Sequence, residues 1–278
     1  MSRTFDCAVW RTSVAAAVLL VAVPAAAADR LTADQIRASV AAAKGRVDLS
    51  TKDMSGADLA GLNLSGANLS GANLSGANLS GANLSGASLS GANLHGVKLV
   101  GADLIGADLS RADLTFTWIM RANFTRARLR GATLQTVVTS TGMENTPDQS
   151  VKFVDADFSD ASITVNFSLD DLRRARFVHA RMTVDMRNQS MGLLRTAFES
   201  ARLDGADFTG AGLGHVTFRF AKLGYARFVD ADLGNADFAG ADLTGVDFTG
   251  AKVRDTNFEG ATLSRVTGLA LPSERSAK

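Results

Sequence analysis

The sequence predicts an all-β solenoid, on three observations. A large apolar residue, here called the centre of a repeat, recurs at every fifth position from Leu49 to Leu134. A small residue, usually Ala, precedes each centre by two positions, with Asn or Asp between them and Ser-Gly after. From Phe198 to Leu263 the centres alternate between Phe and an aliphatic residue without exception. A short fixed period of this kind is typical of a repeat architecture.

The five-residue period matches neither an α-helix, with 3.6 residues per turn, nor a strand that alternates every second residue. The centre and the small residue, two positions apart, can point to one side of an extended segment. The Ser-Gly step then turns the chain, because Gly tolerates the backbone angles that a tight turn requires. The result is a coil with Leu and Ala inside, whose backbone groups bond to the coils above and below.

The Phe alternation bears on the number of sides in each coil. If a coil holds four repeats, Phe198 and Phe218 stack in one column, and Phe208 and Phe228 stack in the opposite one. With three repeats, every column mixes Phe with aliphatic residues. Homogeneous stacks suit a close-packed interior, so the alternation favours an even number.

From Ala57 the chain reads ADLAG LNLSG ANLSG ANLSG, and this tandem pattern resembles the A(D/N)LXX motif of the pentapeptide-repeat family. The resemblance covers most of residues 47–263. It implies a right-handed, four-sided parallel β-helix with one pentapeptide on each side. Some members of that family bind DNA gyrase as DNA-like rods, which is one functional alternative.

Residues 1–28 have the layout of a secretory signal peptide. Arg3 and Arg11 precede an apolar run over 14–23, and Ala26-x-Ala28 is the expected cleavage site. The run is too short for a spanning helix of about 20 residues. We expect a periplasmic or secreted product with no stable membrane insertion after cleavage; the alternative is an uncleaved N-terminal anchor.

The rest of the chain divides into three parts. Residues 29–46 are expected to form a short capping helix, with Thr32 or Asp34 at its start. Residues 47–264 form the solenoid, with breaks in the period around 136–151 and 183–196 and a loss of one residue between Ile163 and Phe167. Residues 265–278 form a C-terminal tail.

Composition excludes several classes of function. Removing residues 1–28 takes away two of the 29 basic and one of the 28 acidic residues, which leaves a net charge of zero. A balanced charge argues against a nucleic-acid binder and against an acidic nucleic-acid mimic. The single cysteine, Cys7, lies in the signal segment. Neither the three histidines nor the repeated serines form a catalytic, metal or cofactor motif, so we predict no enzyme activity and no cofactor.

Three surface features are candidates for binding. An apolar patch is expected where residues beside the Ile119 centre point outward, unless the 136–151 segment covers it: Val100, Phe116, Trp118 and Met120. A basic patch is expected unless Asp155, Asp157, Asp160, Asp170 and Asp171 neutralise it: Arg121, Arg126, Arg128, Arg130, Arg173, Arg174, Arg176 and Arg181. The uncapped last coil is expected to form a homodimer unless residues 264–272 fold over it: Phe258, Leu263, Val266, Leu269 and Leu271.

Together these observations predict a secreted, non-enzymatic binding or scaffold protein with protein partners in the cell envelope. The alternative, a DNA-mimicking protein that interacts with gyrase or another topoisomerase, is disfavoured by the signal segment and the zero net charge.

Overall fold

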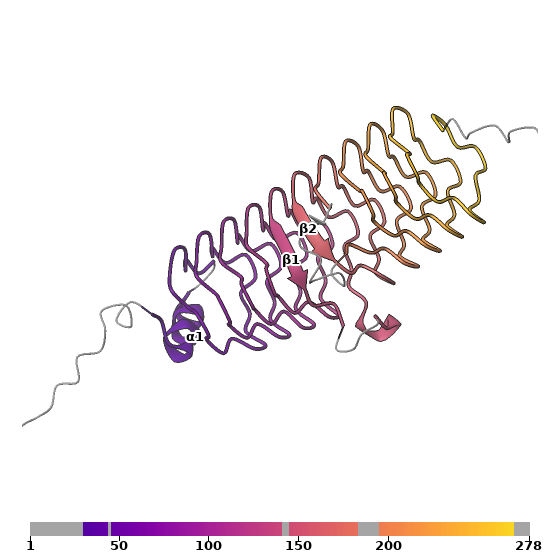
Figure 1. The fold of residues 1–278 in the computed structure, drawn as a ribbon. Coiled ribbons are helices and arrows are strands. Elements are labelled where there is room, and N and C mark those ends of the chain that lie inside the picture. Colours follow the sequence, from indigo (N-terminus) through magenta and orange to yellow (C-terminus); the bar gives the residue numbers. More distant parts are fainter. Residues whose placement is uncertain (1–29, 44–45, 141–144, 183–194, 270–278) are drawn as a thin grey trace, which may run out of the picture.

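The chain winds into a rod of stacked coils in the computed structural model (Figure 1), which describes residues 30–43, 46–140, 145–182 and 195–269. Helix α1 (Ala33–Ala42) lies at one end, and the coil that ends near residue 269 forms the other. The expected signal segment, residues 1–28, and Leu271 lie outside the described residues.

Parallel bridges between coils hold the rod together, and in its regular parts they join residues twenty positions apart. Asn68 is representative: its N–H donates to the carbonyl of Val47 at 2.9 Å, and its carbonyl accepts from the N–H of Leu49 at 2.8 Å. Such bridges form four columns of outward-facing residues, because each coil contains four repeats. The backbone groups of each flat segment are therefore satisfied by the neighbouring coils.

The outward Asn and Asp side chains also hold the turns. The side-chain oxygen of Asn73, for example, accepts the backbone N–H of Ser75 at 3.2 Å. The same contact recurs at most outward Asn and Asp positions along the rod. The repeat therefore prefers Asn or Asp because the side chain forms a local turn, not only because it is polar.

The core consists of the centres and the small residues, and the Phe stacks expected from the alternation are present. The rings of Phe198 and Phe218 are stacked 5.0 Å apart, and those of Phe208 and Phe228 are stacked 4.8 Å apart. Rings in the two columns meet edge to face, as between Phe208 and Phe218 at 5.6 Å and 86°. All four are fully buried.

The period is interrupted where the sequence predicts. Asn123 pairs with Lys152 and Asp171 with Arg202, so two coils are longer than twenty residues. The first break contains a 3-10 helix, η2 (Pro147–Gln149). Strands β1 (Thr133–Val137) and β2 (Ser162–Val165) pair in parallel with a register irregularity, at the place where the sequence loses one residue of phase.

The two ends of the rod differ. At the N-terminal end, Thr32 caps α1 in a capping box with Gln35, and Ile36 is buried against the first coil. At the C-terminal end, Phe258 and Leu263 are only half-buried. Their backbone N–H groups have no backbone acceptor among the described residues, whereas the corresponding groups of earlier coils bond to the next coil.

Candidate functional site

One column of outward residues alternates in charge over seven coils and neutralises itself. Arg128 lies 3.5 Å from Asp108, and Arg227 lies 3.8 Å from Asp207. The members in order are Asp108, Arg128, Asp157, Arg176, Asp207, Arg227 and Asp247. A ladder of alternating charge presents no net field to a partner.

A second column, which we call the Trp118 column, has the opposite character. It carries no charge over five successive coils. The first break begins directly after one member of this column, Val138, and the second break ends directly before another, Ala197. The uncharged members are Trp118, Val138, Asn166, Ala197 and Thr217. Both inserted segments therefore join the rod at this column, which makes it the most distinctive surface of the described chain.

The aromatic part of this column is exposed. Phe116 is 47% and Trp118 is 40% exposed. Phe116 occupies a turn position at φ 59°, where its ring meets the edge of His95 with 5.3 Å between the ring centroids. Val138, next to Trp118 in the column, and Val100 are half-buried.

Met120 does not belong to this exposed surface, contrary to the sequence expectation, because it is only 5% exposed. The N–H of Arg121 donates to the carbonyl of Gln149 at 3.0 Å, so the first break passes over this part of the coil. The 136–151 segment thus covers Met120 and leaves Phe116 and Trp118 open.

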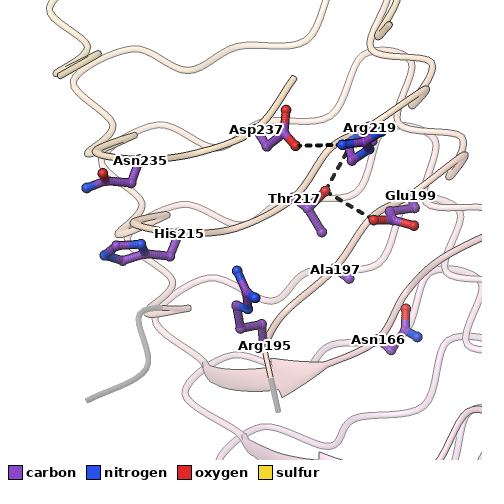
Figure 2. Close-up of a pocket in the computed structure, with 9 residues that line it drawn as sticks. All are labelled: Asn166, Arg195, Ala197, Glu199, His215, Thr217, Arg219, Asn235 and Asp237. Carbon is purple, nitrogen blue, oxygen red and sulfur yellow. Dashed lines mark hydrogen bonds and ion pairs between the residues drawn. The ribbon is translucent and has the colours of Figure 1, made fainter. Parts of the chain in front are cut away.

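Further along the column lies a shallow groove of about 340 Å³ (Figure 2). The small side chain of Ala197 leaves room between larger neighbours at its edges. Three contacts join groove residues: Arg219 to Asp237 at 3.4 Å, Thr217 to Glu199 at 3.4 Å, and the backbone N–H of Arg219 to the hydroxyl of Thr217 at 3.5 Å. The complete lining is Asn166, Arg195, Ala197, Glu199, His215, Thr217, Arg219, Asn235 and Asp237.

The basic residues predicted as a patch are spread over several columns and turns instead of forming one surface. Arg128 and Arg176 belong to the alternating column, and Arg181 lies between Ser162 and Gly212 in another. Arg121, Arg126 and Arg174 occupy turn positions with positive φ.

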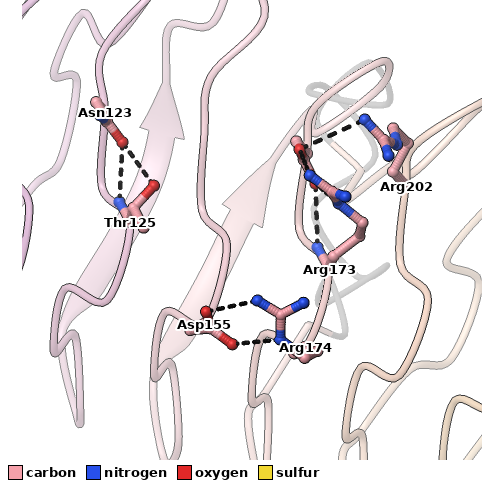
Figure 3. A network of polar contacts seen from close by, with 7 residues as sticks. Asn123, Thr125, Asp155, Arg173, Arg174 and Arg202 are labelled. Carbon is pink, nitrogen blue, oxygen red and sulfur yellow. Dashed lines mark hydrogen bonds and ion pairs between the residues drawn. The ribbon is translucent and has the colours of Figure 1, made fainter.

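Four of these arginines form ion pairs with described residues. Arg174 binds Asp155 through two hydrogen bonds of 2.6 and 2.7 Å (Figure 3), which lower the pKa of that carboxyl. Arg173 binds Asp171 at 2.7 Å. Arg130 reaches Asp160 at 3.0 Å, and the fourth pair is that of Arg128 described above. The expected neutralising carboxylates thus include Asp155, Asp160 and Asp171.

Asp170 was also expected on the surface, and this is wrong: its side chain is fully buried. Burial raises the pKa of Asp170 well above the ordinary carboxyl range. Its Oδ1 accepts the N–H of Val151 at 2.7 Å, and its Oδ2 has no partner among the described residues. The sequence contained the signal, because Asp170 precedes the centre Leu172 by two positions and so occupies the inward slot of Ala.

Two exposed aromatic residues were missed by sequence reasoning. Phe220 and Tyr225, 59% and 64% exposed, occupy turn positions with positive φ. Their rings lie over Gly240 and Gly245, where an added Cβ would fall 2.6 and 2.7 Å from ring atoms. The signal was an aromatic residue in the Gly slot of two successive repeats.

In the described part of the chain, no group of three or more His, Cys, Asp or Glu side chains is arranged to hold a metal ion. In the same residues, no helix has both the length and the apolar character needed to cross a bilayer.

The repeats match a known family model. The family model for pentapeptide repeats (8 copies) matches residues 53–91, 87–126 and 226–265. Among curated proteins, no sequence matches this chain.

Solved structures of pentapeptide-repeat proteins are also similar. HetL from the cyanobacterium Nostoc sp. strain PCC 7120, involved in heterocyst differentiation regulation, is 24% identical over 85% of this chain and 94% of its own, with a TM-score of 0.38. QnrB1, a plasmid-mediated fluoroquinolone resistance protein, is 17% identical over 66% and 88%, with a TM-score of 0.37. Rfr23 from the cyanobacterium Cyanothece 51142 is 17% identical over 52% and 90%, with a TM-score of 0.30. These likenesses say nothing about function. Over residues 53–126 and 226–265, the repeats of this chain match those of the pentapeptide-repeat family.

Proposed function

We propose that this protein is a non-enzymatic binding or scaffold protein, which acts after export in the periplasm or outside the cell. It works by presenting the Trp118 column of its rod to a protein partner in the cell envelope. The proposal takes the rod as a right-handed coil with four sides, and the twenty-residue spacing of the bridges supports the four sides.

The observation that carries the proposal is the asymmetry of the rod. The alternating column neutralises itself, whereas the Trp118 column is uncharged over five coils and exposes two large aromatic rings. Exposed aromatic surface on a folded protein is a common mark of a contact site. The first break begins directly after Val138 and the second ends directly before Ala197, both members of this column.

Export is supported by the layout of residues 1–28, and fractionation of cells that carry a C-terminally tagged chain tests it. We expect the tag in the periplasm or the medium, on a chain shortened by about 28 residues, the length of the expected signal segment. A full-length chain in the cytoplasm would contradict the proposal and favour the topoisomerase alternative. Because that alternative also requires an effect on the enzyme, we expect no inhibition of DNA supercoiling by purified gyrase.

We also propose that two copies associate through their last coils. The half-buried Phe258 and Leu263, together with the N–H groups that lack backbone acceptors, form an open edge of the kind that pairs with another chain. Helix α1 covers the opposite end of the rod, so contact between two C-terminal ends closes the assembly as a dimer instead of extending it as a fibre.

A further inference from the structure

We propose that Phe116, Trp118 and Val138, here called the aromatic patch, bind an acidic segment of a partner protein in which carboxylates flank an apolar side chain. This inference rests on the proposed binding function and specifies the chemistry of the partner at one part of the Trp118 column.

The shape of the patch suits a short extended segment. Trp118 and Val138 are neighbours in the column, and Phe116 stands at the turn before Trp118 with its ring held against His95. Neighbouring coils are about 4.8 Å apart, so the patch matches two or three residues of an extended chain. Val138 is half-buried and the two rings are about half exposed, which leaves an apolar floor for one inserted side chain.

Within the coils themselves, the charges nearest the patch are two cations. Lys98 precedes Trp118 in the column, and Arg121 occupies the turn after Met120; both are exposed, and neither forms an ion pair with a described residue. The carboxylates of the same coil lie in the other three columns: Asp103, Asp108 and Asp113. Asp148, in the neighbouring helix η2, is exposed and forms no ion pair with the described residues either.

An apolar floor with unpaired cations at its rim favours a ligand of opposite charge with an apolar centre. Rim charges of this kind mainly raise the association rate and the specificity, while the buried apolar contact supplies most of the affinity. A partner with basic residues at these positions would place like charges against Lys98 and Arg121, which is unfavourable. The patch therefore selects acidic segments over basic ones.

Trp118 makes the proposal directly measurable. The sequence contains two tryptophans, Trp10 and Trp118, so Trp10→Phe in the full-length chain leaves Trp118 as the sole tryptophan. The probes are nine-residue synthetic peptides with a central Leu flanked by Asp and Glu, matched peptides with Lys and Arg flanks, and matched acidic peptides with a central Ser. We expect the acidic Leu peptide alone to shift the Trp118 emission to shorter wavelength in a saturable way, with binding about tenfold tighter than either control.

Two variants test the rim. Lys98→Glu and Arg121→Asn, the latter chosen because Asn tolerates positive φ, should each weaken the acidic Leu peptide several-fold. The matched control is Lys222→Glu, which removes an exposed cation from another column and should leave binding unchanged. Thermal melts show whether each variant remains folded. Equal binding of acidic and basic peptides, or an equal loss from Lys222→Glu, would overturn the inference.

Other partners give other outcomes. Binding of anionic lipid vesicles or of a single-stranded oligonucleotide, without binding of the acidic peptide, would also overturn it. Failure of this inference differs from failure of the proposed function: if a photo-crosslinker at Thr217 captures an envelope protein while no peptide shifts Trp118, the binding function stands and the acidic segment is wrong.

Discussion

The most informative perturbation of the core is Phe228→Ala. Phe228 is fully buried and stacks on Phe208 at 4.8 Å and on Phe248 at 5.3 Å. Its ring also meets Phe218 and Phe238 edge to face, at 5.6 and 5.5 Å. Emptying a buried Phe site costs about 3–5 kcal/mol, and each aromatic pair adds about 0.5–1.5 kcal/mol beyond burial. Because four ring contacts are lost at once, we expect a cost near the upper end, about 5 kcal/mol.

The matched control is Phe258→Ala in the last coil. Phe258 is half-buried, with one stacked neighbour, Phe238 at 5.4 Å, and one edge contact, Phe248 at 5.8 Å. Half the usual benefit of burying such a side chain is about 1 kcal/mol. Urea unfolding followed by circular dichroism compares the two variants. With an m value of about 3 kcal/mol/M, Phe228→Ala should lower the midpoint by about 1.5 M and Phe258→Ala by about 0.3 M. Equal shifts would refute the difference in burial between the middle of the rod and its last coil.

Three further predictions concern a turn, a buried acid and an end. Asn73→Ala should cost about 1 kcal/mol in urea unfolding, because the N–H of Ser75 loses its acceptor; no loss in this variant would show that the turn contact is dispensable. Burial raises the pKa of Asp170, so its stabilising contribution is complete below about pH 4 and is lost as the pH rises through the raised pKa of the folded state. Since Asn cannot ionise, thermal melts should show Asp170→Asn gaining stability relative to the natural chain as the pH rises above the ordinary carboxyl range, and a pH-independent difference would contradict this. Sedimentation at tens of micromolar should show a dimer that Leu269→Asp/Leu271→Asp converts to a monomer; a monomeric natural chain would favour a tail folded over the last coil.

The interior of the rod was predictable because its rule is local. The period places every centre and every small residue, so the Phe stacks follow from counting along the chain. The inward position of Asp170 also followed from the count, although its charge suggested the surface. The sequence predicts that the outward Asn and Asp side chains are exposed, but it does not show that they hold the turns. That role depends on the hydrogen bond that each side chain accepts from the backbone N–H two residues later.

The surface was less predictable because it depends on which residue lies in the next coil. Met120 is buried because the first break passes over it. The path of a break cannot be predicted from the repeat, because the break does not follow the five-residue period. Phe220 is exposed yet fixed, because its ring lies over Gly240, one coil away. Both facts depend on contacts between coils, which the composition of a single repeat does not contain.

The breaks themselves are built into the rod by specific side chains, and this bears on what the Trp118 column does. In regular coils the N–H of the small inward residue donates to the carbonyl of the preceding centre, three positions earlier, as Ala156 does to Phe153. Val151 follows a break and has no such carbonyl, so the carboxyl of Asp170 accepts its N–H instead.

At two other points near the breaks, side chains again take the place of backbone hydrogen-bond partners. Thr139 and Asn145 donate to the carbonyl of Asn166 at 2.9 and 3.1 Å, and Thr196 donates to the carbonyl of Ile163 at 3.1 Å. A buried polar group is costly unless it is bonded, so side chains that complete the ladder at a break specify one path for the chain. The rod therefore carries its insertions at defined places, both beside the uncharged column that exposes Trp118. A solenoid whose only purpose was to be a straight rod would need neither the insertions nor the buried acid that holds one of them.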